Sequence, residues 1–236
     1  MNLGSFIAVG GCHVGGHAID SNPSFVQLTE NQTGLTCILK QAHFPLKKID
    51  DLDALIQNND PEKILLQLGN YEFHASIKRI LKKNKKKSSI PCTNPNNHAA
   101  SESSLSSSTI KSASSFRNGS SIEPILSMLV LPFIWFFLLK RNRKYLMRVQ
   151  ELAKKYNTKQ FFILSPIPCL KYPDNYIRRR ATKFIHKLLS LQPNVVFIDL
   201  FGQLPQYKAL YFDNFHLNAI GHKNLGKIVS GEILKH

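Results

Sequence analysis

Cysteine is scarce in this chain of 236 residues, and its four copies, Cys12, Cys37, Cys92 and Cys169, form no C-x-x-C pair and no regular spacing. A disulfide framework or a structural zinc site requires such spacing, so neither is expected. The sequence near Met1 also lacks the basic segment and long apolar run of a secretion signal. We therefore expect a cytoplasmic protein, and nothing in the sequence implies a metal or a cofactor.

Acidic residues are also few, since 15 Asp and Glu stand against 31 Lys and Arg, giving a formal charge of +16 at pH 7. Half of this excess lies in residues 78–117, which hold nine basic residues and one acidic residue. Evenly spread basic charge would indicate a nucleic-acid surface, whereas a single lysine run beside low-complexity sequence is typical of a solvated or membrane-facing tract. We therefore expect no nucleic-acid partner.

Large apolar residues are almost missing from residues 84–121, which are rich in Ser and Asn. Such a segment cannot bury enough apolar surface to offset the entropy cost of ordering it. We expect a disordered insertion there. Apolar residues still make up 43% of the chain, a normal globular share, and the length suits a single α/β domain over residues 1–236.

No apolar run has the length of a clear membrane span. The longest, residues 125–139, contains Ser127 and Pro132, and as a helix it would rise about 22 Å against a hydrocarbon core of about 30 Å. Four basic residues follow within residues 140–144. Three interpretations stay open for this apolar helix with its basic flank, residues 125–144: a buried helix kinked at Pro132, interfacial or re-entrant contact with a membrane, or a short membrane span.

Short apolar runs bounded by turn residues recur at residues 6–9, 36–39, 64–68, 161–164 and 195–198. Each has the length and the β-branched or aromatic content of a buried strand. Apolar residues at helical spacing separate them, at residues 49–56, 145–156 and 176–191. This alternation predicts a three-layer α/β/α fold with a mostly parallel five-stranded sheet.

The segment Asp213-Asn214-Phe215-His216 lies between the last predicted strand and a C-terminal helix. An Asp and a His three residues apart in a loop can both face one cleft, where the carboxylate orients the imidazole as a general base. An ordinary turn before a helix is the alternative.

Two other predicted strands end at residues with reactive or hydrogen-bonding side chains. Gly10-Gly11-Cys12 is typical of a tight turn before a helix, whose positive end would favour the thiolate of Cys12 as a nucleophile. The alternative role for Cys12 is that of a small buried hydrophobic residue. Gly69-Asn70 ends the third strand, where the Asn70 amide would donate to an oxyanion or simply form a turn.

These three strand ends, in this order, resemble the sequence blocks of the SGNH hydrolases, also called the GDSL esterase/lipase superfamily. Gly10-Gly11-Cys12 stands at the first block, Gly69-Asn70 at the third, and Asp213-Asn214-Phe215-His216 at the last. The resemblance covers the chain except the insertion and the apolar run, and it implies the flavodoxin-like SGNH-hydrolase fold.

The resemblance also implies roles for these residues in acyl transfer through a covalent intermediate. Cys12 would be the nucleophile, His216 the general base and Asp213 its orienting carboxylate. Asn70 and the backbone N–H of Cys12 would form the oxyanion hole.

The sequence departs from the family pattern at each of the first three blocks. Cysteine replaces serine at the nucleophile, a change compatible with a thioester intermediate. Gly69-Asn70 lacks the one-residue spacer of the third block. The glycine of the second block is missing from the loop 41–44, so one oxyanion donor has no assigned residue.

Several other histidines and a group of arginines are predicted to have no part in the chemistry. A metal site at Cys12, His13 and His17 is disfavoured because no carboxylate or second cysteine completes it nearby. His43 and His74 are expected to be structural or exposed, with a place in the cleft as the alternative. The three arginines at residues 178–180 are expected to form a solvated helix face.

Together these features predict an SGNH-like hydrolase that cleaves an ester through an acyl-enzyme on Cys12. The expected substrate is a small-molecule, carbohydrate or lipid ester, reached by a cytoplasmic protein with peripheral membrane contact. Two alternatives stay open: an acyltransferase acting on a sugar hydroxyl, and a non-catalytic protein that keeps the SGNH fold.

Overall fold

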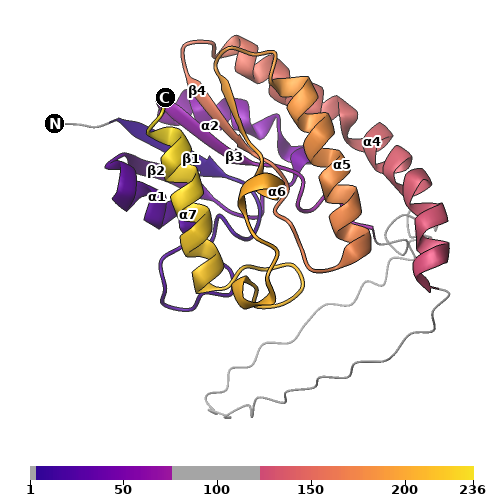
Figure 1. The fold of residues 1–236 in the computed structure, drawn as a ribbon. Coiled ribbons are helices and arrows are strands. Elements are labelled where there is room, and N and C mark those ends of the chain that lie inside the picture. Colours follow the sequence, from indigo (N-terminus) through magenta and orange to yellow (C-terminus); the bar gives the residue numbers. More distant parts are fainter. Residues whose placement is uncertain (1–3, 76–122) are drawn as a thin grey trace, which may run out of the picture.

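A computed structural model describes residues 4–75 and 123–236, with only the helical backbone for residues 123–129 (Figure 1). The sheet has five strands in the order β2-β1-β3-β4-β5, and its neighbouring strands pair in parallel. The strands are β1 Ser5–Val9, β2 Thr36–Gln41, β3 Lys63–Gln67, β4 Gln160–Leu164 and β5 Val195–Ile198. The predicted five-stranded parallel sheet is therefore confirmed, with strand positions that agree closely with the apolar runs.

Helices cover both faces of the sheet, which confirms the three-layer α/β/α architecture (Figure 1). On one face lie α2 Asp51–Asn59, α4 Glu123–Lys155 and α5 Tyr172–Leu189. On the other lie α1 Phe25–Thr33, α7 Ala219–Ile233 and the short α6 Leu200–Gln203. Two 3₁₀ turns, η1 Leu46–Lys48 and η3 Lys208–Leu210, complete the described elements.

The inner strands β1, β3 and β4 are apolar almost throughout because both faces of the sheet are covered there. In β1, Ile7 and Val9 pack toward α2, α4 and α5, whereas Phe6 and Ala8 pack toward α1 and α7. Buried parallel strands show this continuous apolar pattern rather than alternation.

Helix α4 is one continuous helix of 33 residues, although the sequence pattern suggested two separate helices. Pro132 lies inside it, where the ring removes one backbone hydrogen bond. Leu131, Ile134 and Leu138 are buried at helical spacing, so packing on the sheet holds this stretch in place. No helix in residues 4–75 and 123–236 is both long and apolar enough to cross a bilayer.

The prediction of a helix directly after Cys12 is wrong. Residues 11–18 form consecutive turns, in which the backbone N–H groups of Val14 and Gly15 donate to the carbonyls of Gly11 and Cys12, both at 3.1 Å. Gly16 takes a φ of 78°, so the chain leaves the helical region there. Helix α1 begins only at Phe25.

The predicted insertion at residues 84–121 lies outside the described residues, between β3 and α4. The strand order places β1 between β2 and β3, so the chain passes from β1 to β2 on one side and then back across to β3 on the other. In open α/β sheets a ligand site forms at the carboxyl edge beside such a reversal. Here this edge carries the loops that follow β1, β2 and β3.

Candidate active site

The turn that carries Cys12 is held between the loops that follow β2 and β3. The Gly10 N–H donates to the Gln41 carbonyl at 3.0 Å, and the Phe44 N–H donates to the Gly10 carbonyl at 2.8 Å. A Cβ on Gly10 would lie 2.6 Å from the Cβ of Gln67, so only glycine fits. The sequence thus places Cys12 at the sheet edge through close backbone packing.

The sulfur of Cys12 is partly buried and lies 3.7 Å from Nδ1 of His13. Burial raises the pKa of the Cys12 thiol, and hydrogen bonds from Tyr71 and the backbone offset this only in part. The predicted thiolate is therefore not favoured. No helix follows Cys12 directly, so the positive helix end that was expected to stabilise the thiolate is missing. At neutral pH the group is a thiol.

His13 is fully buried in a defined tautomer. Its Nε2 accepts the backbone N–H of Leu217 at 3.2 Å, so in the neutral ring Nδ1 carries the proton. Burial lowers the pKa of His13 well below its usual value, which keeps the ring neutral. Nδ1–H is thus a donor directed at the sulfur of Cys12.

Asp213 and His216 form the hydrogen-bonded pair that their spacing predicts. His216 Nδ1 lies 2.7 Å from Asp213 Oδ2, while Asp213 Oδ1 accepts the backbone N–H groups of Phe215 and His216 at 2.6 and 2.7 Å. Burial alone would raise the pKa of Asp213, but these hydrogen bonds hold it below its usual value. The carboxylate therefore fixes Nδ1 as the protonated nitrogen and leaves Nε2 free as a base.

His216 lies close to His13 and His17, the two histidines of the Cys12 turn. Its ring centroid is 5.7 Å from that of His13 and 4.4 Å from that of His17. Within the described residues, no hydrogen bond joins the Cys12 sulfur to His216 in this conformation. The structure thus brings the predicted nucleophile and base to one edge without joining them.

Asn70 also lies beside the Cys12 turn. Its Oδ1 accepts the backbone N–H of Ile167 at 2.8 Å, and its Nδ2 lies 3.4 Å from Nδ1 of His13. Gly69 before it has a φ of 85°, and a Cβ there would lie 2.7 Å from Pro166. Gly69 and the loop after β4 therefore hold the Asn70 amide in its position beside the Cys12 turn.

Arg178 corrects one sequence expectation. Its side chain is only 3% exposed, and Nη1 donates to the Ile167 carbonyl at 2.7 Å. Arg179 and Arg180 are exposed, as expected. Arg178 lies on the inner face of α5 beside Ile177 and Ala181. The helical spacing of the apolar residues in this helix would have indicated that Arg178 is buried.

The loop after β2 carries no glycine, yet one of its residues adopts the conformation that glycine favours. His43 has a φ of 55°, and its Nδ1 lies 2.8 Å from the Tyr71 hydroxyl. His74 lies 3.0 Å from the buried Asp174 and stacks on Phe215. Both histidines are thus held by neighbours at this edge of the sheet.

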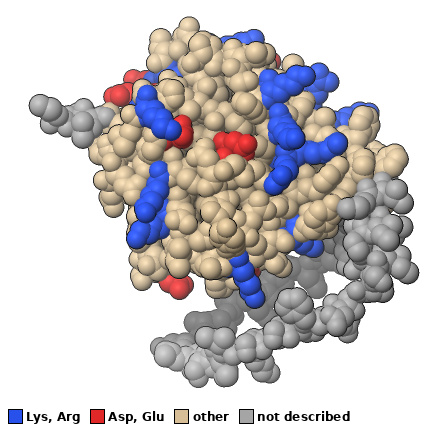
Figure 2. All heavy atoms as spheres, in the orientation of Figure 1, with Lys and Arg blue, Asp and Glu red and all other residues tan. Residues whose placement is uncertain are grey.

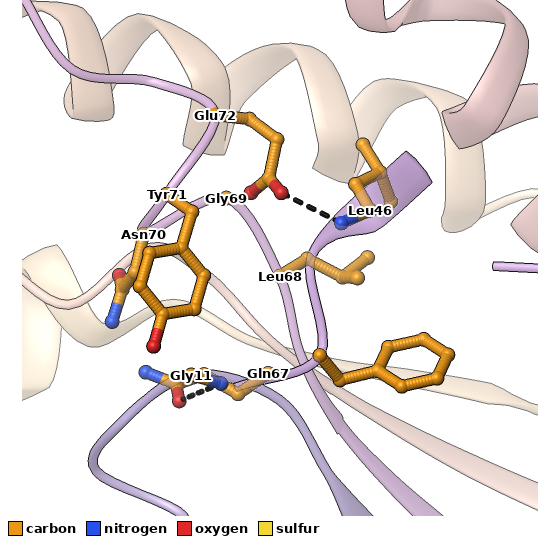
Figure 3. Close-up of a pocket in the computed structure, with 9 residues that line it drawn as sticks. Gly11, Leu46, Gln67, Leu68, Gly69, Asn70, Tyr71 and Glu72 are labelled. Carbon is orange, nitrogen blue, oxygen red and sulfur yellow. Dashed lines mark hydrogen bonds between the residues drawn. The ribbon is translucent and has the colours of Figure 1, made fainter. Parts of the chain in front are cut away.

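Two further residues at this edge, Gln67 and Tyr71, were missed in the sequence. Gln67 accepts the Gly11 N–H through Oε1 at 3.1 Å, and the Tyr71 hydroxyl acts to lower the pKa of the Cys12 thiol. Figure 3 shows the Tyr71 hydroxyl pointing toward Gln67 and Gly11. Neither residue belongs to a recognised block, so only the three-dimensional arrangement reveals them.

The described part of the chain contains no group of three or more His, Cys, Asp or Glu side chains arranged to hold a metal ion. Figure 2 shows basic side chains on one face of the molecule in several separate groups, with acidic side chains between some of them.

Comparison with solved structures identifies the architecture. A lipolytic protein of the G-D-S-L family from Desulfitobacterium hafniense DCB-2 superposes with a TM-score of 0.56 at 11% identity, over 96% of this chain and 98% of that one. A lipase/acylhydrolase from Enterococcus faecalis gives a TM-score of 0.57 at 10% identity, over 97% and 94% of the two chains. The chain has the fold of the SGNH, or GDSL, hydrolases.

The fold also extends to an esterase of carbohydrates. A family 3 carbohydrate esterase from Clostridium thermocellum superposes on this chain with a TM-score of 0.55 at 12% identity, over 98% and 97% of the two chains. No protein-family model and no curated protein sequence matches the chain. The likeness is therefore one of structure, at identities of 10–12% in these three comparisons.

Proposed function

We propose that this protein is an SGNH-type acyl hydrolase that cleaves an ester through a covalent intermediate on Cys12. The observation that carries the proposal is the Asp213–His216 pair, which leaves Nε2 of His216 free as a base at the edge that carries Cys12. Asn70 Nδ2 and the backbone N–H of Cys12 are the proposed oxyanion donors.

The raised pKa of Cys12 determines how the first step proceeds. Because the resting group is a thiol, its proton must pass to His216 as the sulfur attacks the carbonyl carbon, after a side-chain rotation toward Nε2. The tetrahedral oxyanion collapses to a thioester, and the imidazolium gives its proton to the leaving alkoxide.

Hydrolysis of the thioester uses the same base. His216 takes a proton from water as the water oxygen attacks the thioester carbonyl. Collapse of the second oxyanion releases the carboxylic acid, and the proton returns to the sulfur. If a sugar hydroxyl takes the place of water, the same steps give acyl transfer.

The proposed substrate is a small ester of a carbohydrate or a lipid. Structures with this fold include a carbohydrate esterase and a lipase/acylhydrolase, which supports both classes. Product analysis with a sugar acceptor present separates hydrolysis from transfer, because only a transferase would form the acylated sugar.

A non-catalytic role is the second candidate, and one observation favours it: the Cys12 sulfur is not hydrogen-bonded to His216 among the described residues. The test is the turnover of 4-nitrophenyl acetate by the wild-type chain and by Cys12→Ala. We expect Cys12→Ala to lower kcat/KM by at least about 10³-fold. Equal rates in the two proteins would favour the non-catalytic role.

We also propose that α4 touches an anionic membrane surface. Phe133, Phe136 and Phe137 are 69%, 62% and 58% exposed, although they are large apolar residues. The exposed Lys140 and Lys144 follow them on the same helix. An exposed apolar stripe beside basic residues is typical of helices that lie in the membrane interface.

A further inference from the structure

Gln67 holds an amide donor without a partner next to the Cys12 turn. It is the last residue of β3 and only 4% exposed. Its Oε1 accepts the N–H of Gly11, the residue before Cys12, whereas its Nε2 has no hydrogen-bond partner among the residues that the structure describes. A buried amide N–H without a partner is unfavourable and uncommon in folded proteins, so this group calls for an explanation.

The orientation of this amide is fixed by its neighbour. A backbone N–H can only donate, so the atom that accepts from Gly11 must be the oxygen, and the other end of the amide must be the NH₂ group. A Cβ on Gly11 would lie 3.2 Å from Gln67 Oε1. Glycine at this position therefore lets the amide lie close against the chain that carries Cys12.

The free end of the amide is itself buried, beside a narrow hollow that is too tight for a water molecule in this conformation and is lined by Gly11, Gln67, Asn70 and Tyr71, among others (Figure 3). In this view the Tyr71 hydroxyl points toward the Gln67 amide and the Gly11 backbone. Burial helps to raise the pKa of Tyr71 to about 12, so its hydroxyl keeps its proton at neutral pH. The Gln67 amide and the Tyr71 hydroxyl, which also lies 2.8 Å from His43 Nδ1, therefore meet beside the Cys12 turn.

Asn70 carries the neighbouring amide, whose Nδ2 is already one of the proposed oxyanion donors. Its Oδ1 is held by Ile167, and its Nδ2 lies beside His13 Nδ1, which carries a proton of its own. The two N–H groups face each other and form no hydrogen bond. Gln67 Nε2 is a further buried, oriented donor, at the end of β3.

We propose that Gln67 Nε2 is a catalytic oxyanion donor, the one that the second sequence block leaves unassigned, and that the Tyr71 hydroxyl assists it. This inference rests on the proposed acyl hydrolysis. As the carbonyl oxygen of the ester gains negative charge, Nε2–H would donate to it and gain the partner that it lacks in the free protein. A donor that is oriented before the reaction stabilises this charge without reorganisation.

The variant Gln67→Glu tests the donor separately from the structural bond. The new carboxyl keeps an oxygen to accept the Gly11 N–H but places a second oxygen where Nε2 was. At pH 8 we expect kcat for 4-nitrophenyl acetate to fall about 10²-fold, with KM changed less than about twofold. As the pH falls and this carboxyl is protonated, it becomes a donor, so the ratio of wild-type to variant kcat should shrink.

Gln150→Glu is the matched control. Gln150 lies on α4, where its Nε2 donates to the Leu188 carbonyl at 3.1 Å, away from the Cys12 turn. We expect this control to keep the wild-type kcat at every pH. A second variant, Tyr71→Phe, keeps the ring and loses the hydroxyl, and we expect kcat to fall about tenfold with KM little changed.

The outcomes separate this inference from the proposed function. If turnover depends on Cys12 but Gln67→Glu keeps the wild-type kcat, or loses it by a pH-independent factor, then Gln67 is not an oxyanion donor and the hydrolase proposal stands. If the wild-type chain shows no Cys12-dependent turnover, both proposals fail. If Gln67→Glu does not fold, an unchanged kcat in Tyr71→Phe overturns the proposal that Gln67 and Tyr71 donate together to the oxyanion.

Discussion

Cys12 combines a reactive side chain with surroundings that keep it protonated. Its sulfur receives hydrogen bonds from His13 and Tyr71, yet burial outweighs them and raises the pKa of the thiol. A serine hydrolase uses a neutral hydroxyl and an external base in the same way. Cysteine at this position is therefore compatible with general-base catalysis by His216 and does not require a resting thiolate.

This view predicts the pH dependence of Cys12 alkylation. The thiolate is the reactive form, so the rate of labelling by iodoacetamide should rise with pH and still be rising at pH 9. Peptide mass spectrometry distinguishes Cys12 from the other cysteines. A rate that reaches its plateau below pH 8 would show a depressed pKa and contradict the structure.

The Asp213 carboxylate sets the tautomer of His216, so Asp213→Asn should impair catalysis without disturbing the loop. The amide would favour a proton on Nε2, where the base is needed, and kcat should fall about 10³–10⁴-fold. The exposed Asp20→Asn serves as control and should keep full activity. A loss of less than about tenfold would argue against His216 as the base.

Among site residues, the sequence revealed those that lie in recognisable local patterns. Asp213 and His216 interact across a four-residue loop, so their spacing predicted their contact. Gln67 binds Gly11, and Tyr71 lowers the pKa of Cys12, both from a different strand end more than 50 residues away in the chain. Such contacts depend on strand order and backbone packing, which no local pattern contains.

At the level of elements, apolar runs predicted strand positions well because both faces of the sheet are buried. The same patterns failed where turn geometry decides the structure. Gly15 and Gly16 end the turns after Cys12 before a helix can form, and α4 continues through Pro132 because tertiary packing compensates for the lost hydrogen bond.

Helix α4 yields a prediction about membranes. Replacing Phe133, Phe136 and Phe137 together by Ser removes the exposed apolar stripe, so binding to vesicles that contain phosphatidylserine should fall at least about tenfold in a sedimentation assay. Neutral phosphatidylcholine vesicles should bind the wild type weakly. Exposed Leu191→Ser is the control and should bind as the wild type does. Equal binding by the triple variant and the wild type would contradict the proposal.

For the whole molecule, buried histidines couple stability to pH. Burial lowers the pKa of His222 from 6.5 to about 4, and it also lowers that of His13. Between these values the unfolded chain binds more protons than the folded one, so stability is full above pH 6.5 and is lost as the pH falls. For His222 this loss is up to about 3 kcal/mol.

Urea unfolding at pH 7.5, 6 and 5 measures this effect. His222 Nδ1 accepts the Phe25 N–H at 3.1 Å, and His222→Asn keeps an acceptor while removing the titrating ring. The variant should therefore show a shallower decline of the unfolding free energy below pH 6.5 than the wild type. Parallel declines in the two proteins would mean that His222 does not titrate on unfolding.

The whole-molecule fold was predictable because the SGNH resemblance and the apolar pattern point to the same architecture. The covalent intermediate on Cys12 is the central element of the proposed chemistry. Intact-mass spectrometry of the wild-type chain mixed rapidly with 4-nitrophenyl acetate tests it directly, with Cys12→Ala as the control. The account predicts a transient adduct of one acetyl group that is located on Cys12 and absent from the variant. Turnover without such an adduct, or an acetyl group on another residue at equal rates in both proteins, would contradict it.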